Sequence, residues 1–166
     1  TPGIFEMDLS KFCSNTSKVN ATIANQLALY LTMYSPLQMA ADFPEHYEQF
    51  ADAFQFIKDV AVDWQKSKYL LAEPGDYIVV ARKAKKTGKW FAGGVTDENS
   101  RTLDVPMNFL DPGKTYVAKI YSDASDADYQ KNPQAYVINE QEVTSESILP
   151  IFMARGGGFA IEFSEK

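Results

Sequence analysis

Residues 62–84 read VDWQKSKYLLAEPGDYIVVARKA, and the hydrophobic period of the chain changes within this stretch, at Trp64. Before Trp64 the apolar residues recur at helical spacing, whereas after it short apolar runs alternate with turn signals. The tetrapeptide EPGD at 73–76 has proline and glycine at the positions where a type II turn needs them. We therefore expect a helical part over residues 1–64 and a β part over residues 65–166.

About eight short segments of the β part have the composition of strands and are bounded by turn signals such as DPGK at 111–114. Segment 101–109 alternates apolar and polar residues, and Pro106 within it indicates an edge strand. Short strands at this spacing, with no long helix between them, predict an antiparallel Greek-key sandwich and, for the whole chain, an α+β fold. The expected strands are 68–73, 77–84, 89–97, 101–109, 115–123, 135–140, 147–153 and 158–163.

The first predicted helix spans about residues 19–34. It follows a polar loop, and either Ser17 or Asn20 can cap its first turn. Its apolar residues cover nearly the whole circumference, which is typical of a helix buried on most sides. We expect this surface to fold back on the sandwich or to pair with another chain.

Two further helices are predicted from proline positions. Pro36 suits the first turn of a short helix over 36–41 with Ser35 as its cap, and Pro44 opens a third helix over about 44–58. Trp64 then lies at the junction, where we expect it to pack between the helical and β parts.

The composition and charge exclude several classes of protein. The chain has 45% hydrophobic residues, enough for a core, and a net charge of −6, which provides no basic surface for nucleic acid. No stretch reaches the roughly 18 apolar residues of a membrane span. Cys13 is the single cysteine, so no intramolecular disulfide can form. The start of the sequence, TPGIFEMD, shows no targeting signal.

Two motifs superficially resemble ligand sites. Asp123, Asp126 and Asp128 do not have the alternate spacing, glycine and final glutamate of a calcium loop, so we interpret them as a solvated loop and predict no metal site. The run RGGG at 155–158 precedes a predicted strand rather than a helix, so we interpret it as a turn and not as a phosphate-binding loop.

The remaining polar candidates are few. His46 has no second ligand at metal spacing, and Cys13 has no recognisable partner, so both are interpreted as structural. Glu45 and Glu48 fit the first turns of a helix, where carboxylates are favoured. Glu6 has no such local explanation, and it is kept as a candidate substrate-binding residue.

Aromatic and basic side chains of the β part allow two interpretations. Trp90, Phe91, Tyr116 and Tyr121 could form a platform on which a sugar stacks, but core packing is favoured because large aromatic residues dominate cores. The lysines at 83, 85 and 86 flank a hairpin turn and are interpreted as a solvated tip.

Seven segments together closely resemble glycoside hydrolase family 97, which comprises bacterial, calcium-dependent α-glucosidases and α-galactosidases. The resemblance covers essentially the whole chain, and its most specific stretches are SPLQMAAD followed by VDW, and the series VTDEN, FLDPGKTY and IYSDA. The segments are TPGIFEMD (1–8), QLALYLTMYSPLQMAADFPEHYE (26–48), FIKDVAVDW (56–64), EPGDYIVVARK (73–83), WFAGGVTDENSRTL (90–103), NFLDPGKTYVAKIYSDASDADY (108–129) and GGGFAIEF (156–163).

This resemblance implies that residues 1–64 are the end of a (β/α)8 catalytic barrel and residues 65–166 a C-terminal β-sandwich. It places the family's catalytic carboxylates and calcium-binding glutamates upstream of this chain, so no catalytic residue is assigned here. It also implies an oligosaccharide substrate held by the missing domain and calcium in the parent enzyme. The sandwich would then support structure or homo-oligomer contacts, and the parent would lie in the periplasm or cell envelope. The alternative is a stand-alone carbohydrate-binding or interaction module.

Overall fold

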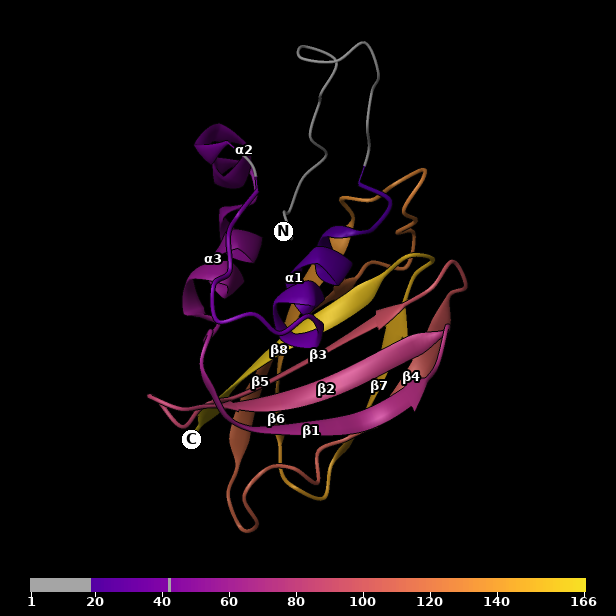
Figure 1. The fold of residues 1–166 in the computed structure, drawn as a ribbon. Coiled ribbons are helices and arrows are strands. Elements are labelled where there is room, and N and C mark those ends of the chain that lie inside the picture. Colours follow the sequence, from indigo (N-terminus) through magenta and orange to yellow (C-terminus); the bar gives the residue numbers. More distant parts are fainter. Residues whose placement is uncertain (1–18, 42) are drawn as a thin grey trace.

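The computed structural model describes residues 19–41 and 43–166, whose helices and strands form three layers (Figure 1). One sheet has the order β1-β2-β3-β8-β5-β6, the other pairs β4 with β7, and every pairing is antiparallel. The predicted α+β fold with an antiparallel sandwich is therefore confirmed. The elements are α1 (Ile23–Thr32), α2 (Pro44–Glu48), α3 (Ala51–Asp59), β1 (Trp64–Glu73), β2 (Tyr77–Ala84), β3 (Trp90–Thr96), β4 (Arg101–Pro106), β5 (Tyr116–Asp123), β6 (Tyr136–Val143), β7 (Ile148–Met153) and β8 (Gly158–Glu165).

The core of the sandwich lies between the large sheet and the β4–β7 pair. Alternate residues of β2, β3, β5 and β8 point into it and meet Val105, Leu149 and Ile151 from the small sheet. Phe109 lies between Trp90 and Phe163, with ring centroids 5.1 and 5.4 Å away. This alternation of burial arises because successive strand residues point to opposite faces of the sheet.

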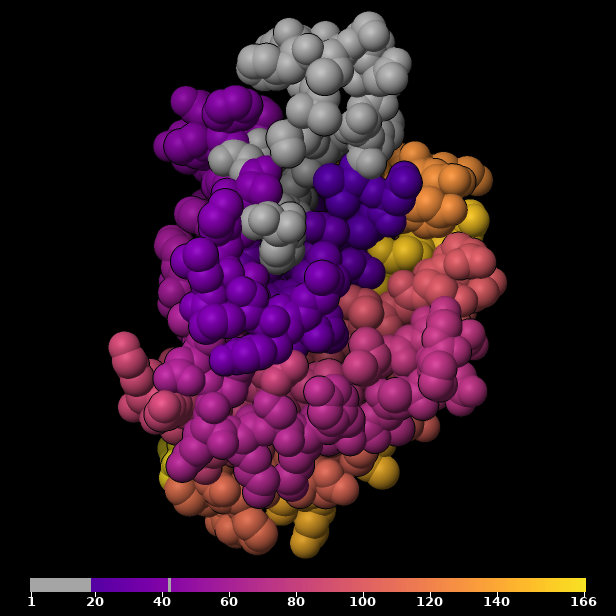
Figure 2. Space-filling model, viewed as in Figure 1, coloured from indigo at the N-terminus to yellow at the C-terminus, as the bar shows by residue number. Residues whose placement is uncertain are grey.

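The helices cover the opposite face of the large sheet. Figure 1 shows α1 lying across β3 and β8, and in Figure 2 the indigo and purple atoms of the helical part sit directly against the magenta atoms of β1 and β2. A second apolar cluster fills this layer; it includes Leu27, Leu31 and Phe56 from the helices and Phe91 and Tyr121 from the sheet. The prediction that the first helix folds back on the sandwich is confirmed.

Gly93 explains how α1 approaches the sheet so closely. A Cβ atom at this position would lie 2.8 Å from the Leu31 Cδ1 atom, so any larger residue would push the helix away. The β2–β3 register runs without a shift past Gly93. Of the two explanations for a glycine inside a strand, a bulge or a close approach, the structure therefore selects the close approach.

The predicted helix over 36–41 is wrong. No regular secondary structure forms there, and the Ser35 hydroxyl donates to the Leu37 carbonyl while accepting from the Leu37 N–H group. Leu37 and Met39 are exposed. A single helical turn is stabilised mainly by burying an apolar face, and this segment buries none.

The predicted helix over 44–58 is divided into α2 and α3. The backbone leaves the helical region at Phe50, with φ −130° and ψ 46°, and the Phe50 ring lies 6.3 Å from that of Tyr136. The N-cap of the first helix is Thr22, whose side chain accepts a hydrogen bond from the Asn25 N–H group, and not the predicted Asn20. Ser17 lies outside the described residues.

Trp64 occupies the junction that its position in the sequence predicts. It is the first residue of β1, and its ring lies 5.8 Å from that of Phe91 in an edge-on arrangement. The strand thus begins earlier than the predicted start at 68. Pro106 lies in β4, which pairs with β7 alone, as expected for an edge strand.

Candidate functional site

Asp123, at the end of β5, is a buried carboxylate with 4% of its surface exposed. Its Oδ2 atom accepts hydrogen bonds from the backbone N–H groups of Ala154 and Gly158, each at 2.8 Å. The Thr22 side chain, at the N-cap of α1, favours the ionised form of the same carboxyl and so lowers its pKa. Asp123 therefore joins the end of β5, the turn between β7 and β8, and the N-cap of α1.

The glycine-rich turn between β7 and β8 binds the helical layer through its carbonyl groups. The Gly156 carbonyl accepts from the Thr22 N–H group at 3.1 Å. The Gly157 carbonyl accepts from the Asn25 side-chain amide at 2.9 Å and from the Thr96 N–H group at 3.0 Å. The interpretation of this segment as a turn is confirmed, and the structure adds that the turn anchors the start of α1.

Burial raises the pKa of the Asp123 carboxyl to about 6, and the hydrogen bonds from Thr22, Ala154 and Gly158 oppose this rise. The second oxygen, Oδ1, is buried and has no hydrogen-bond partner in the part of the chain that the structure describes. The ionised form is thus solvated by donors at one oxygen only. Its charge is therefore more costly in the folded chain than in the unfolded one.

We expect this carboxyl to give the fold a pH dependence that Asp123→Asn removes. The folded pKa lies above the ordinary value of 3.8 for an aspartate, so the folded state holds more protons and loses stability as pH rises from about 4 to about 6. The loss should be on the order of 2–3 kcal/mol. Urea unfolding across pH 4–7 measures it.

Asp126→Asn, a neutralised exposed carboxylate in the following loop, is the matched control and should keep the slope. Asp97 and Asp128 have pKa values lowered mainly by backbone N–H donors, so their effects appear as pH falls below about 4 and leave this window clear. An Asp123→Asn variant with the wild-type slope would contradict the assignment.

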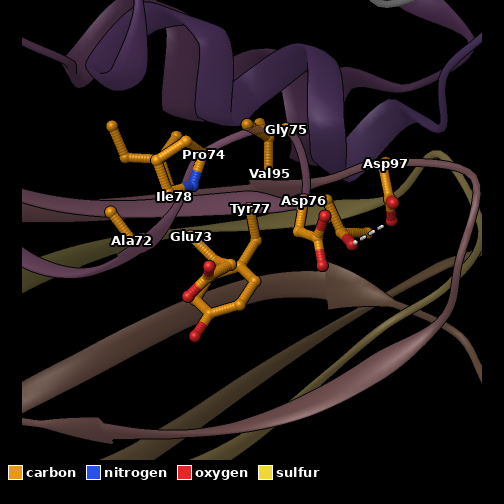
Figure 3. Close-up of a pocket in the computed structure, with 10 residues that line it drawn as sticks. Ala72, Glu73, Pro74, Gly75, Asp76, Tyr77, Ile78, Val95 and Asp97 are labelled. Atoms are coloured by element: carbon orange, nitrogen blue, oxygen red, sulfur yellow. Dashed lines mark hydrogen bonds between the residues drawn. The ribbon is translucent and has the colours of Figure 1, made fainter.

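A shallow hollow of about 520 Å³ lies at the turn between β1 and β2. Figure 3 shows Ile78 and Val95 on one side of the hairpin, with Glu73 and Tyr77 pointing to the other side. Gly75 has φ +94°, as the predicted type II turn requires. The hollow therefore lies around a hairpin end, and the Tyr77 side chain and acidic groups line it together with apolar side chains.

Two of the carboxylates around this hollow, Asp76 and Asp97, are paired with Arg101. The Arg101 guanidinium lies 2.6 Å from an Asp97 oxygen and 3.5 Å from Asp76, and it stacks 4.9 Å from the centroid of the Tyr77 ring. The N–H group of Asn99 contributes most to holding the pKa of Asp97 at about 2. A carboxyl group that is ionised and engaged in this way stabilises the turn and is no candidate general acid.

The helical layer carries an exposed apolar surface, which we call the helical-side apolar surface. Its members are large side chains between α1 and α2 that are 53–73% exposed: Met33, Tyr34, Leu37, Met39 and Phe43. The Tyr30 hydroxyl holds this connection by donating to the Met39 carbonyl at 3.2 Å. A hollow of about 500 Å³ continues it along α2 and α3, between Ala40 and Lys58. A cluster of exposed apolar side chains of this kind indicates a contact site for another protein surface.

Of the candidates predicted from the sequence, the four aromatic residues are confirmed as core. Trp90, Phe91, Tyr116 and Tyr121 are at most 4% exposed, so they form core and cannot serve as a sugar platform. His46 is half-buried on α2, where Glu45 and Glu48 are exposed. Glu6 and Cys13 lie outside the described residues, so the Glu6 candidate stays untested.

The lysine-rich hairpin is a solvated tip only in part. Lys86 is exposed, and Lys85 is exposed while it pairs with Asp63. Lys83 is instead half-buried: its amino group lies 3.4 Å from an Asp111 oxygen and 5.5 Å from the centroid of the Trp90 ring.

The interpretation of the three aspartates as one solvated loop is wrong for Asp123. Asp126 is exposed, and Asp128 forms an ion pair with Arg155 at 3.1 Å, but Asp123 faces inward. The available signal is its place two residues after Tyr121, on the strand face that the helices cover. Within residues 19–41 and 43–166, no cluster of three or more histidine, cysteine or acidic side chains could hold a metal ion. Likewise, none of the helices described has the length and apolar character needed to cross a membrane.

Curated relatives of this chain are much longer than it is. A retaining alpha-galactosidase of Bacteroides thetaiotaomicron is 31% identical over 150 residues, which are 90% of this chain and 22% of the relative. A probable retaining alpha-galactosidase of Streptomyces bingchenggensis is 28% identical over 84% of this chain. The chain thus spans about a fifth of the length of these relatives.

Solved structures extend the likeness to the helical layer. A glycoside hydrolase family 97 enzyme from Pseudoalteromonas sp. strain K8, solved with acarbose, is 45% identical and superposes with a TM-score of 0.93 over all of this chain and 26% of its own. A beta-arabinopyranosidase, 18% identical with a TM-score of 0.73, shares the fold. The family model described as glycosyl-hydrolase 97 C-terminal, oligomerisation, matches residues 63–164. This match spans more than half of the chain, which therefore belongs to the C-terminal oligomerisation family of glycoside hydrolase 97 proteins.

Proposed function

We propose that this chain is the C-terminal part of a longer glycoside hydrolase that cleaves terminal α-glycosidic bonds, of the α-glucosidase or α-galactosidase type. The observation that carries this proposal is the superposition over the entire chain, helices included, on a quarter of a family 97 enzyme. A free-standing sandwich would have no reason to retain α1–α3. The curated relatives, both named as retaining alpha-galactosidases, support the same reaction class.

In this proposal the chemistry lies in the rest of the enzyme. Hydrolysis of a glycoside needs two carboxyl groups facing each other across the bond. The carboxyl groups described above are instead occupied in structural roles: Asp123 in the turn, Asp97 on Arg101, and Asp111 on Lys83 and Tyr116. The catalytic pair, the oligosaccharide site and any calcium ion would belong to the preceding domain, and the parent would act in the periplasm or cell envelope.

The helical layer would then connect the sandwich to the catalytic domain. One side of α1 and α3 packs on the large sheet, and the helical-side apolar surface remains uncovered. This surface is on the loop between α1 and α2, where a neighbouring catalytic domain would cover it, whereas α1 itself is buried on most sides. The carbohydrate-binding alternative is less well supported, since the aromatic side chains that could have stacked on a sugar are buried.

Activity assays separate these roles. We expect the 166-residue chain alone to leave p-nitrophenyl α-glucopyranoside and α-galactopyranoside intact, and the longer gene product to release p-nitrophenolate from at least one of them. Chelation by EDTA should abolish that release and added calcium should restore it. Hydrolysis by the short chain, or an inert longer product, would contradict the proposal.

A further inference from the structure

The outer face of the β4–β7 pair is apolar along one strand. Residues of β7 alternate between exposed and buried, so that Ile148, Pro150 and Phe152 point away from the core. Ile148 is 62% exposed and Phe152 37%. Their cross-strand neighbours on β4 are Pro106, Asp104 and Thr102. We call these six residues the small-sheet face; Asp104 is its single charged member.

This strand lacks the protection found on the edge strands of the large sheet. Exposed edges are normally kept from associating by charged side chains and bulges. β1 carries Lys66 and Lys68 and has two register shifts, and β6 carries Glu140 and Glu142. β7 reads ILPIFM and carries no charge. The exposed apolar residues of β7 are therefore not accounted for by the isolated fold.

Proline residues in β4 and β7 prevent a further strand from pairing along their edges, so another molecule can associate with this pair only through its face. Pro106 and Pro150 have no N–H group, so neither strand can offer a continuous ladder of donors to an added strand. The small-sheet face has no such obstacle. Its apolar side chains can pack against a second flat, apolar surface in the way that two sheets pack in a sandwich.

The small-sheet face lies on the opposite side of the large sheet from the helices. Leu149 and Ile151, the buried residues of β7, join the core on one side of that sheet, whereas Leu31 and Phe56 cover the other side (Figure 1). These two apolar surfaces, both formed by described residues, are therefore separate. The helical-side apolar surface lies before residue 63, outside the range that the oligomerisation family model matches, and the small-sheet face lies within it.

We propose that the small-sheet face is the centre of the contact between two copies of this chain, and that the helical-side apolar surface is covered by the catalytic domain of the longer protein. The assignment of the two surfaces to different partners rests on the proposed function, in which a catalytic domain precedes this chain. A second copy offers the same apolar face, so a two-fold axis can bring both together.

Strand geometry limits what this face can contribute. Two strands of this length present a face roughly 20 Å long and 10 Å wide. A stable interface buries on the order of 800 Å² on each partner, so the face supplies the dry centre and neighbouring polar residues supply the rim. Substitutions at such a centre have the largest effects on affinity.

The test compares the 166-residue chain with two double variants of equal charge change. Ile148→Lys with Phe152→Lys alters the small-sheet face, and Leu37→Lys with Met39→Lys alters the helical-side apolar surface. All four side chains are exposed, so both variants should fold, which circular dichroism checks. Each variant brings the net charge of −6 closer to zero, so weaker association cannot come from overall repulsion.

Sedimentation of protein at 1 to 200 µM should show that the wild type forms a dimer. The dissociation constant of the dimer should rise at least about 100-fold in the variant at 148 and 152. The variant at 37 and 39 should still form a dimer. Hydroxyl-radical labelling of Phe152 should fall as wild-type dimer forms. Dissociation on changing 37 and 39 instead would overturn the surface assignment. A wild type that stays monomeric would overturn the oligomer contact itself, and the glycosidase assay would remain a separate test of the proposed activity.

Discussion

Gly157→Ala should be the most damaging small substitution in this chain, with a loss of at least about 4 kcal/mol in the free energy of unfolding. An added Cβ atom would lie 1.9 Å from the Asp123 Oδ2 atom and 2.7–2.8 Å from backbone atoms of Ala154. Backbone on one side and a buried carboxylate on the other leave no room for relaxation. The turn must open, and the bonds from Asn25 and Thr96 to the Gly157 carbonyl are lost with it.

Thermal unfolding measures this effect against a matched control. For a chain of this size about 4 kcal/mol corresponds to a fall in Tm of roughly 8–16 °C. Gly88→Ala is the control: Gly88 has φ +70°, but nothing lies within 4 Å of its would-be Cβ atom. That substitution costs only the backbone conformation, about 1–2 kcal/mol. A Gly157→Ala protein that melts within 2 °C of wild type would show that the turn is not packed as described.

Phe56→Ala should destabilise the helical layer by about 3–5 kcal/mol. Phe56 is fully buried between the helices and the large sheet, with ring centroids 5.3 Å from Tyr121 and 6.3 Å from Phe91. Truncation leaves a cavity bordered by strands on one side, which cannot collapse into it. The loss should fall mainly on the helices, because the sandwich core lies on the other face of the sheet.

Hydrogen exchange distinguishes a local from a global effect. Amides of α1 and α3 should exchange faster in Phe56→Ala, whereas those of β4 and β7 should keep most of their protection. Phe54→Ala is the matched control, since Phe54 is on the same helix but half-buried, with the Lys58 amino group 5.4 Å from its ring centroid. Equal losses for both variants would refute the central role of Phe56.

Both variants act on the attachment of the helical layer. Gly157 fixes the start of α1 through the hydrogen bond from Asn25 to its carbonyl, and Phe56 fixes α3 through apolar packing. In the proposed enzyme, these helices connect the sandwich to the catalytic domain. A loosened layer would therefore reduce the stability of the longer protein even though it contains no catalytic group.

The strands were predictable because their signals are local. Period-two alternation and Pro-Gly turns predict all eight strands of the described region, with ends displaced by a few residues. The helices were less predictable. The loop over 36–41 and the break at Phe50 depend on which apolar faces find a partner, and propensity carries no such information.

The candidate site was largely invisible in the sequence. Asp123 has the surroundings of a loop residue, with Ser125, Asp126 and Asp128 after it, and composition alone favours solvent exposure. Its burial depends on donors contributed more than thirty residues away along the chain. The small-sheet face illustrates the same limit, because ILPIFM is apolar at every position and its sequence does not show which residues the fold leaves exposed.

The sequence by itself determined the change from helices to strands near Trp64, the antiparallel sandwich and the resemblance to family 97, since each depends on neighbouring residues or on motif order. Only the tertiary structure decided that Thr22 caps α1, that Asp123 is buried in the β7–β8 turn, and that two apolar surfaces lie on opposite sides of the sheet. The physical reason is that hydrogen-bond partners and burial are set by residues distant in sequence, whereas strand period and turn chemistry are set by adjacent ones.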